Sequence, residues 1–304
     1  MDRHSQTPPD YRDASAESAL ADTRAAIAHT GPLSSLITPT VTPRFAPSCS
    51  DTLLRGLGQL AQSDGGPLPI QTHLAESRGE LELVRELFPD AASYTAVYDG
   101  YGLLTERTVL AHCIHISDEE VRLIRARNAG VSHCPTSNMA LGSGTAKVRR
   151  LLDEGVKVGL GTDVSAGWAM GMLGVCRAAI GCSALLAEGG ETRARLSESE
   201  VLFLATRGGA QVMGLAEKGV GVFKVGGVWD AQLVELGLEV GDGEEDDNAW
   251  GSGAVDVWET QSWEEKIGKW IWGGDERNTV RVWVAGREVW RRPDVRSSVP
   301  LHER

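Results

Sequence analysis

Long apolar runs and an excess of positive charge are both absent from this chain of 304 residues. No stretch reaches the roughly 18 to 20 consecutive apolar residues that a membrane helix needs, and the polar start MDRHSQTPPDYRD carries no apolar signal region. With 42 acidic residues against 30 basic ones, the formal charge of −12 repels phosphate backbones and anionic membrane surfaces. We therefore expect a cytoplasmic protein that binds neither nucleic acid nor membranes.

Cysteine motifs are missing as well. The five cysteines are odd in number, widely spread, and include no Cys-x-x-Cys. This pattern argues against a disulfide framework and against a cysteine-based zinc site. It also excludes the cytidine-type zinc deaminases, because these enzymes carry a Pro-Cys-x-x-Cys signature.

What the sequence does contain is an alternation of strand and helix patterns, with 41% apolar residues to form a core. A helix is predicted over 15–31, and Ser-x-x-Glu capping boxes predict helix starts at Ser117 and Ser197. Such alternation predicts right-handed crossover units on a parallel sheet, and five are expected. The β-prone segments are 36–41, 69–73, 108–112, 130–133 and 156–162.

The pattern changes after residue 215, where short strands with glycine turns predict a small antiparallel β-domain. The Gly-rich acidic stretch 241–253 within it is typical of a solvated loop. We expect four parts: a helical entry segment belonging to the parallel-sheet unit (1–35), the main portion of that unit (36–218), a small β-domain segment with an acidic loop at 239–265 (219–296), and a tail (297–304).

Chemically capable residues gather where the predicted strands end. Arg44 follows the first strand, His73, His112 and His133 end the next three, and Asp163 follows the fifth. In a (β/α)8 barrel the carboxyl ends of the strands form the face on which active sites are built. Imidazole and carboxylate groups together are a ligand set for zinc or a similar divalent ion, which makes His73, His112 and Asp163 a candidate metal centre.

Each candidate also has an ordinary structural interpretation. A single strand-end histidine is commonly a hydrogen-bonded structural residue, and Asp163 is placed to cap a following helix. Glu76 is either a general acid/base near a metal-bound water or a first-turn acid of the helix SRGELELVRELF. Arg44 with Phe45 suits a planar heterocycle bearing a carbonyl, and equally suits surface packing.

Six stretches of the sequence together resemble the guanine deaminases, zinc enzymes of the amidohydrolase superfamily. The resemblance runs in order over about residues 1 to 290, and its PRF, SCS and THxxE elements are the more specific ones. The stretches are TPRFAPSCS (42–50), QTHLAES (71–77), TVLAHCIHIS (108–117), HCPTSN (133–138), VGLGTDVSAG (158–167) and GGDERNTVRVWVAGREV (273–289).

This resemblance implies a fold and a reaction. The fold is α/β: a partial (β/α)8 TIM-type amidohydrolase barrel, about strands 4 to 8, followed by C-terminal strands of a small β-sandwich domain. The reaction is hydrolysis of guanine to xanthine and ammonia in purine catabolism, with one zinc ion per subunit and homodimeric assembly. Arg44 and Phe45 would hold the guanine.

The resemblance also implies the roles of the strand-end residues. His73 and Asp163 would be zinc ligands, and Asp163 would also take a proton from the nucleophilic water. Glu76 would move protons between that water and the purine ring, and His112 would lie beside the metal and hydrogen-bond the water.

One motif of the family has no counterpart here. The first metal motif of the guanine deaminases is His-x-His, and no two of the seven histidines are separated by one residue. We therefore expect that the chain begins within the enzyme and lacks two zinc ligands. It is then either an incomplete copy of a full enzyme or a product without activity. The alternatives are another amidohydrolase acting on a ring amine and a non-catalytic interaction protein.

Overall fold

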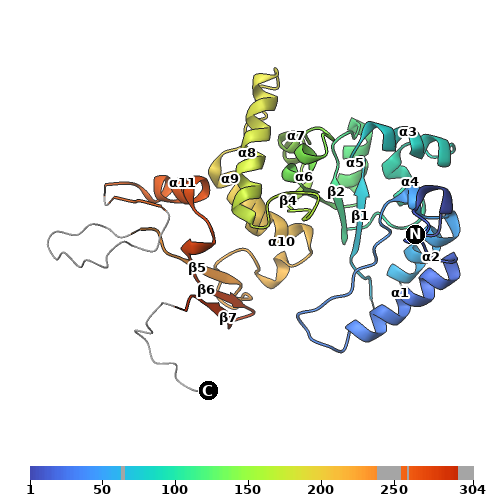
Figure 1. The fold of residues 1–304 in the computed structure, drawn as a ribbon, viewed down its shortest axis with the longest axis horizontal. Helices are drawn as coiled ribbons and strands as arrows, with labels where there is room; N and C mark the ends of the chain where they lie inside the picture. Colours follow the sequence, from blue (N-terminus) through green and yellow to red (C-terminus); the bar gives the residue numbers. More distant parts are fainter. Residues whose placement is uncertain (63–65, 238–254, 259, 294–304) are drawn as a thin grey trace. The chain divides into compact units, whose positions relative to one another are not determined.

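The computed structural model describes residues 1–62, 66–237, 255–258 and 260–293. The chain divides into two compact units, Met1–Ala216 and Glu217–Arg304 (Figure 1). The acidic stretch predicted at 241–253 lies outside the described residues. Within the described residues, no helix combines the length and the apolar character needed to cross a membrane.

A four-stranded parallel sheet lies at the centre of the first unit. Its order is β1-β2-β3-β4, with bounds Ile70–Leu74, Thr108–His112, Gly130–His133 and Lys157–Leu160. The strands begin and end within two residues of the predicted bounds. Ile70, Leu110 and Val158 point to one face of the sheet, where all three are at most 1% exposed, whereas Gln71, His73 and Val109 on the other face are partly exposed.

The first predicted strand, at 36–41, is not a strand. Only Val41 contacts the sheet, through an isolated parallel bridge to Ile70, so the five expected strands are four strands and a bridge. Pro39 has no N–H to donate to a ladder, and the side chains of Leu36 and Ile37 are 62% and 48% exposed. The apolar residues here therefore gain no burial from β-pairing.

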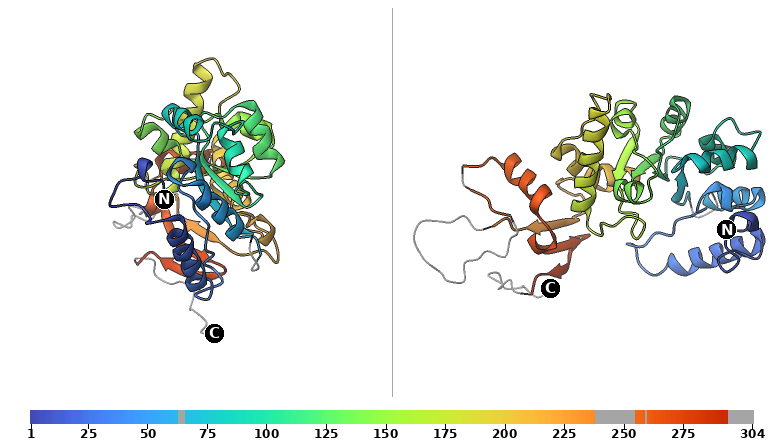
Figure 2. Two further views of the ribbon diagram at one scale, coloured as in Figure 1. Left: turned by 90° about the vertical axis from the view of Figure 1, so that its right-hand side faces the viewer. Right: turned by 45° about the horizontal axis from the view of Figure 1, so that its top comes forward.

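Ten α-helices accompany this sheet in the described part of the first unit, and in Figure 2 α1 lies alongside α2. The predicted helix at 15–31 is α1, capped by Ser15, and the predicted capping boxes at Ser117 and Ser197 open α5 and α9. The bounds are α1 Ala16–Thr30, α2 Asp51–Ala61, α3 Arg78–Leu87, α4 Tyr94–Gly100, α5 Asp118–Ala126, α6 Pro135–Ala140, α7 Val148–Asp153, α8 Met172–Glu188, α9 Glu198–Phe203 and α10 Gly209–Val212.

The structural interpretation of Glu76 as a first-turn acid is wrong. Helix α3 begins after its N-cap Ser77, so Glu76 lies outside the helix. The acid of the first turn is Glu80, whose side chain accepts hydrogen bonds from the N–H groups of Glu76 (2.8 Å) and Ser77 (3.3 Å). The side chain of Glu76 is therefore not used by the cap.

The second unit contains a three-stranded antiparallel sheet, β5-β6-β7, with bounds Ala231–Val234, Thr279–Val284 and Arg287–Arg291. A tight turn at Ala285 and Gly286, both with positive φ, joins β6 to β7 as the glycine-turn pattern predicts. The unit also has a helix that was not predicted, α11 at Trp263–Gly273, although Ser262 and Glu265 form the same capping box as in the first unit.

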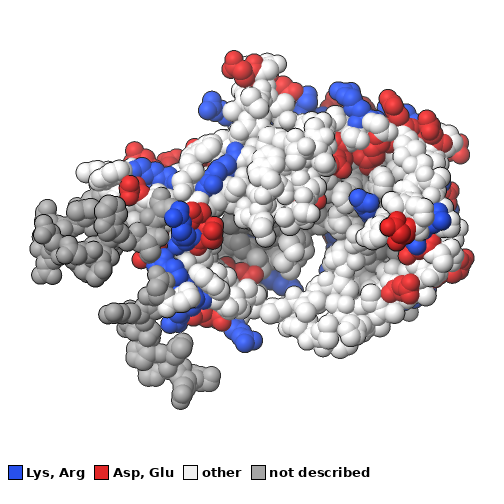
Figure 3. All heavy atoms as spheres, viewed as in Figure 1, with Lys and Arg blue, Asp and Glu red and all other residues white. Residues whose placement is uncertain are grey.

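Charged side chains of both signs are spread over the surface. On the face in Figure 3, Lys and Arg atoms lie among Asp and Glu atoms rather than in one block.

Candidate metal centre

The predicted residues of the centre lie at one edge of the parallel sheet. His73 is the penultimate residue of β1, His112 is the last residue of β2, and Asp163 follows β4 by three residues. The register pairs Leu74 of β1 with His112 of β2. Because the strands are parallel, their carboxyl ends bring these side chains to the same edge.

The backbone turns sharply where these strands end. Ala75, His112, Cys113 and Asp163 all have a left-handed conformation, with φ between 47° and 71°. This region is costly for residues other than glycine, and such residues concentrate at functional sites. Two hydrogen bonds support the turn after β2: the N–H of Cys113 donates to the carbonyl of Leu74 (2.9 Å), and the N–H of Ile114 donates to that of Ala75 (3.2 Å).

His112 is the centre of the cluster. Its Nε2 lies 3.7 Å from Oε2 of Glu76 and 3.9 Å from Oδ2 of Asp163, beyond the length of a direct hydrogen bond. The side chain of His112 is 1% exposed, and its buried Nε2 has no hydrogen-bond partner within the described part of the chain. The ring of His73 stacks on that of His112, with 5.3 Å between centroids. The structure thus brings His73, Glu76, His112 and Asp163 together.

His73 is oriented by the segment that follows the bridge at Val41. Its Nδ1 donates to the carbonyl of Arg44 at 2.7 Å, because a carbonyl oxygen can only accept. In a neutral ring with this hydrogen bond, Nε2 of His73 is the nitrogen that carries the lone pair, the form of imidazole that binds a metal. The side chain of Arg44 is exposed, and its guanidinium carbon lies 5.8 Å from the centroid of the Phe45 ring.

The donors fit a zinc-like ion in type but not in number. One imidazole and one carboxylate, from His73 and Asp163, are suitable ligands, and the unpartnered Nε2 of His112 faces the same space. Zinc sites use at least three protein ligands. Among the described residues, however, no group of three or more His, Cys, Asp or Glu side chains is arranged so that it could hold a metal ion.

Residues 2–289 match the amidohydrolase family. The chain belongs to this family. Its carboxyl-end cluster of histidines and acids therefore lies on an amidohydrolase scaffold.

Several known proteins resemble this amidohydrolase chain closely. It is 45% identical to a probable guanine deaminase of Schizosaccharomyces pombe, over 97% of this chain and 55% of the relative. A guanine deaminase of C. acetobutylicum, solved with guanine in its active site, is 35% identical, with a TM-score of 0.80 over 94% of this chain and 63% of that one. The chain thus spans little more than half the length of the curated relative.

A more distant solved structure is similar to this chain in its fold only. An adenosine deaminase of Xanthomonas campestris, solved with bound zinc, is 23% identical, with a TM-score of 0.71 over 90% of this chain and 56% of that one.

A buried tyrosine that lies in none of the sequence motifs connects the segments around this cluster. The Tyr98 hydroxyl on α4 accepts from the N–H of Ala46 (2.9 Å) and from the Thr72 hydroxyl (2.9 Å), and donates to the carbonyl of His73 (2.8 Å). Burial raises the pKa of Tyr98, so the phenol stays neutral. The sequence offered no signal for this role, because α4 contains none of the matching stretches.

Tyr94, one helical turn before Tyr98, extends this connection to the turn that carries Glu76. Its hydroxyl donates to Oε1 of Glu80 at 2.7 Å, and the other oxygen of Glu80 accepts from the N–H of Glu76. Helix α4 thereby supports three segments: the one around Arg44, the end of β1, and the turn after it.

His133 ends β3 and is fully buried. Burial, with the neighbouring His112 as a smaller cause, lowers the pKa of His133 from 6.5 to about 4. Its Nδ1 has no hydrogen-bond partner among the residues that the structure describes. His133 is thus a neutral histidine beneath the cluster at neutral pH.

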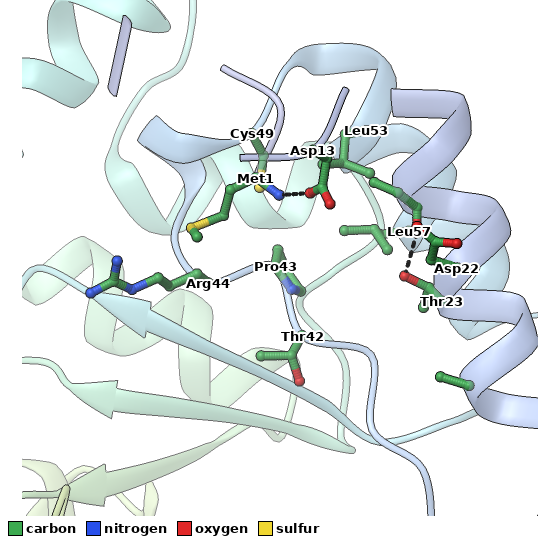
Figure 4. Close-up of a pocket in the computed structure, with 12 residues that line it drawn as sticks. Met1, Asp13, Asp22, Thr23, Thr42, Pro43, Arg44, Cys49, Leu53 and Leu57 are labelled. Atoms are coloured by element: carbon green, nitrogen blue, oxygen red, sulfur yellow. Dashed lines mark hydrogen bonds and ion pairs between the residues drawn. The ribbon is translucent and has the colours of Figure 1, made fainter. Parts of the chain in front are cut away.

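A pocket of about 290 Å³, drawn in Figure 4, is lined by none of the four residues His73, Glu76, His112 and Asp163. Its walls come from the N-terminal segment, α1, α2 and the stretch Thr42–Arg44. In Figure 4 the guanidinium of Arg44 points away from the lining residues of α1 and α2, and Asp13 pairs with the ammonium group of Met1. Of the predicted site residues, only Arg44 lines this pocket.

Proposed function

We propose that this chain carries catalytic residues of a guanine deaminase, which hydrolyses guanine to xanthine and ammonia. The observation that carries the proposal is the approach of two carboxylates, from Glu76 and Asp163, to the buried Nε2 of His112 at 3.7 and 3.9 Å. The 45% identity to a probable guanine deaminase and the likeness to a guanine-bound one support it.

The proposal includes the architecture around the site. The four-stranded parallel sheet would belong to a partial (β/α)8 barrel over 36–218, and the three-stranded sheet to a small β-sandwich within 219–296. Subunits would pair as homodimers. The parallel order of β1 to β4 and the antiparallel order of β5 to β7 support this division.

His73 and Asp163 are the residues that would contribute to holding zinc, with further ligands needed to complete the set. When bound, zinc acts as a Lewis acid and lowers the pKa of water toward neutrality. The remaining chemistry belongs to side chains of this chain, and it consists of binding the purine and moving protons.

Two carboxylates would divide the proton transfers. Asp163 takes a proton from the attacking water, and Glu76 transfers a proton to the ring nitrogen next to the amino-bearing carbon. The water oxygen then forms its bond to that carbon, the carbon–nitrogen bond to the amino group breaks, and the second proton of the water leaves with ammonia. The proton held by Asp163 returns to Glu76, which restores both side chains to their starting states. His112 would accept a hydrogen bond from the water through Nε2.

Arg44 and Phe45 would hold the substrate. The guanidinium is a planar donor for the purine carbonyl, and the Phe45 ring offers an apolar face for stacking. The hydrogen bond from His73 to the Arg44 carbonyl connects this recognition segment with the candidate ligand, so a shift of one would move the other.

The test is ammonia release from guanine by residues 1–304 with added zinc, together with guanine binding measured by equilibrium dialysis. Glu76→Gln keeps the shape of the side chain but removes its charge. Any ammonia release by the wild-type chain is expected to fall by about 10² to 10⁴ in this variant, while guanine still binds. Glu82→Gln, at an exposed position of α3, is the matched control.

Three results separate the candidate functions. Ammonia release that depends on Glu76 supports the deaminase. Guanine binding without ammonia would instead favour a purine-binding protein that does not turn its ligand over. A chain that neither releases ammonia nor binds guanine would contradict the proposal. The remaining hypothesis would then be a non-catalytic interaction protein.

A further inference from the structure

We propose that Asn138 is a positioning residue that decides which nitrogen of His112 carries the proton. Its side-chain oxygen holds the Nδ1–H of His112, and Nε2 remains a bare acceptor facing Glu76 and Asp163. Asn138 lies in α6, and neither the charge pattern nor the strand ends single it out.

The side chains of His112 and Asn138 form a hydrogen bond that is buried from solvent. Nδ1 of His112 lies 2.9 Å from Oδ1 of Asn138, and the two residues are 0% and 1% exposed. The backbone of Asn138 is anchored on both sides: its N–H donates to the carbonyl of Cys134 (3.0 Å), and its carbonyl accepts from the N–H of Ser143 (2.9 Å). These two backbone hydrogen bonds fix the position from which the Asn138 side chain reaches the His112 ring.

Asn138 serves this contact at a cost. Its buried Nδ2 has no hydrogen-bond partner in residues 1–62, 66–237, 255–258 and 260–293, and an unpaired buried donor costs about 1–3 kcal/mol. An apolar side chain of similar size would avoid that cost. The polar residue is thus poorly explained by packing and well explained by the bond to His112.

The geometry on the other side of the ring agrees with this proton position. A protonated Nε2 beside a carboxylate would close to about 2.7–2.9 Å, whereas the two oxygens stand at 3.7 and 3.9 Å. A neutral imidazole has one donor and one acceptor nitrogen, so Nδ1–H leaves Nε2 with its lone pair. The stacked ring of His73, 5.3 Å away between centroids, limits rotation of the plane.

Three acceptor atoms then face one another across the cluster, from His112, Glu76 and Asp163. Such an arrangement suits a guest that brings donors or positive charge, such as water or a cation. This use of the bare Nε2 rests on the proposed function, but the proton position itself does not and can be read without substrate.

The experiment is a long-range ¹⁵N–¹H correlation spectrum of the histidine side chains of the full chain at about pH 8, above the ordinary histidine pKa of about 6.5. Two residues serve as internal references, because each bonds to a carbonyl that can only accept. His73 donates through Nδ1 to Arg44 (2.7 Å), and His115 donates through Nε2 to Ser143 (2.8 Å). We expect His112 to show the pattern of His73 and the opposite of that of His115.

Two substitutions test whether Asn138 determines which nitrogen of His112 carries the proton. Asn138→Asp keeps an oxygen acceptor and is expected to retain the Nδ1–H form. Asn138→Leu removes the acceptor and is expected to shift His112 to the Nε2–H form or to a mixture of both. Met139→Leu, at the exposed next position of the same helix, is the control and should leave the spectrum of His112 unchanged.

The proposal is overturned if wild-type His112 carries its proton on Nε2, or if Asn138→Leu leaves the Nδ1–H form in place. The wild-type spectrum and the Asp variant decide the question even if the Leu variant does not fold. Ammonia release plays no part in this readout, so failure of the deaminase proposal and failure of this one are told apart.

Discussion

At the scale of single residues, burial decides the protonation state of His133, and this predicts a pH dependence of stability. The folded pKa of about 4 lies below the ordinary 6.5, so the unfolded chain binds the proton first. The contribution of His133 is complete above about pH 6.5 and is lost as the pH falls toward 4, with a slope of at most about 1.4 kcal/mol per pH unit.

Urea unfolding between pH 7.5 and 4.5 measures this slope. His133→Leu is expected to reduce the slope of the unfolding free energy against pH by up to about 1.4 kcal/mol per pH unit, which corresponds to one proton. Its free energy of unfolding at pH 7.5 will differ from that of the wild type. Equal slopes for the two proteins would mean that His133 does not remain neutral in the folded state.

A second residue-scale prediction concerns the loop that carries Asp163. A Cβ on Gly167 would lie 2.1 Å from the carbonyl oxygen of Thr162 and 2.5 Å from the Thr136 hydroxyl, so the loop must move. We expect Gly167→Ala to lower the free energy of unfolding by about 1–3 kcal/mol, measured by urea denaturation.

Gly181→Ala is the matched control for this substitution. Gly181 is exposed within α8, and an added Cβ meets no atom within 4 Å. Alanine should raise the free energy of unfolding there by about 0.5–1 kcal/mol. If both variants shift stability in the same direction by the same amount, close packing at Gly167 is not the cause.

At the scale of elements, α4 holds the site segments together through Tyr98. Tyr98→Phe leaves the N–H of Ala46 and the carbonyl of His73 without this partner, which should cost about 1–3 kcal/mol of stability. In the Tyr98→Phe protein we also expect the amide of Ala46 to exchange its hydrogen faster than in the wild type, while amides in the centre of β3 exchange at an unchanged rate.

Tyr11→Phe provides the comparison, because Tyr11 is 66% exposed. It should change neither the unfolding free energy nor the exchange at Ala46. A Tyr98→Phe protein with wild-type protection at Ala46 would show that the hydroxyl is not what secures this segment.

At the scale of the whole molecule, the two units are expected to unfold in separate transitions. Eight of the nine tryptophans lie after residue 228, in the second unit, whereas the ten α-helices of the first unit dominate the far-ultraviolet circular dichroism. In a Trp168→Phe variant, urea transitions followed by fluorescence and by circular dichroism should therefore differ in midpoint. Coincident curves would indicate a single cooperative unit.

Sequence-based predictions were correct where the signal depends on residues close together in the chain and failed where it depends on a distant partner. Capping boxes at Ser117 and Ser197 predicted helix starts, because the cap is formed by residues three positions apart. The strand at 36–41 was wrong because its pairing depended on a neighbour that only Val41 reaches. The helix α11 was missed although Ser262 carried the same local signal, because it lies next to a stretch interpreted as a loop.

The sequence by itself determined the alternation of strands and helices, and with it the placement of His73, His112 and Asp163 at carboxyl ends, since both follow from periodicity along the chain. Only the tertiary structure decided which atoms meet: the bond between His112 and Asn138, 26 positions apart, and the turn that releases Glu76 from the helix cap. Such contacts depend on strand order and register, and these are set by packing between segments that the local sequence does not encode.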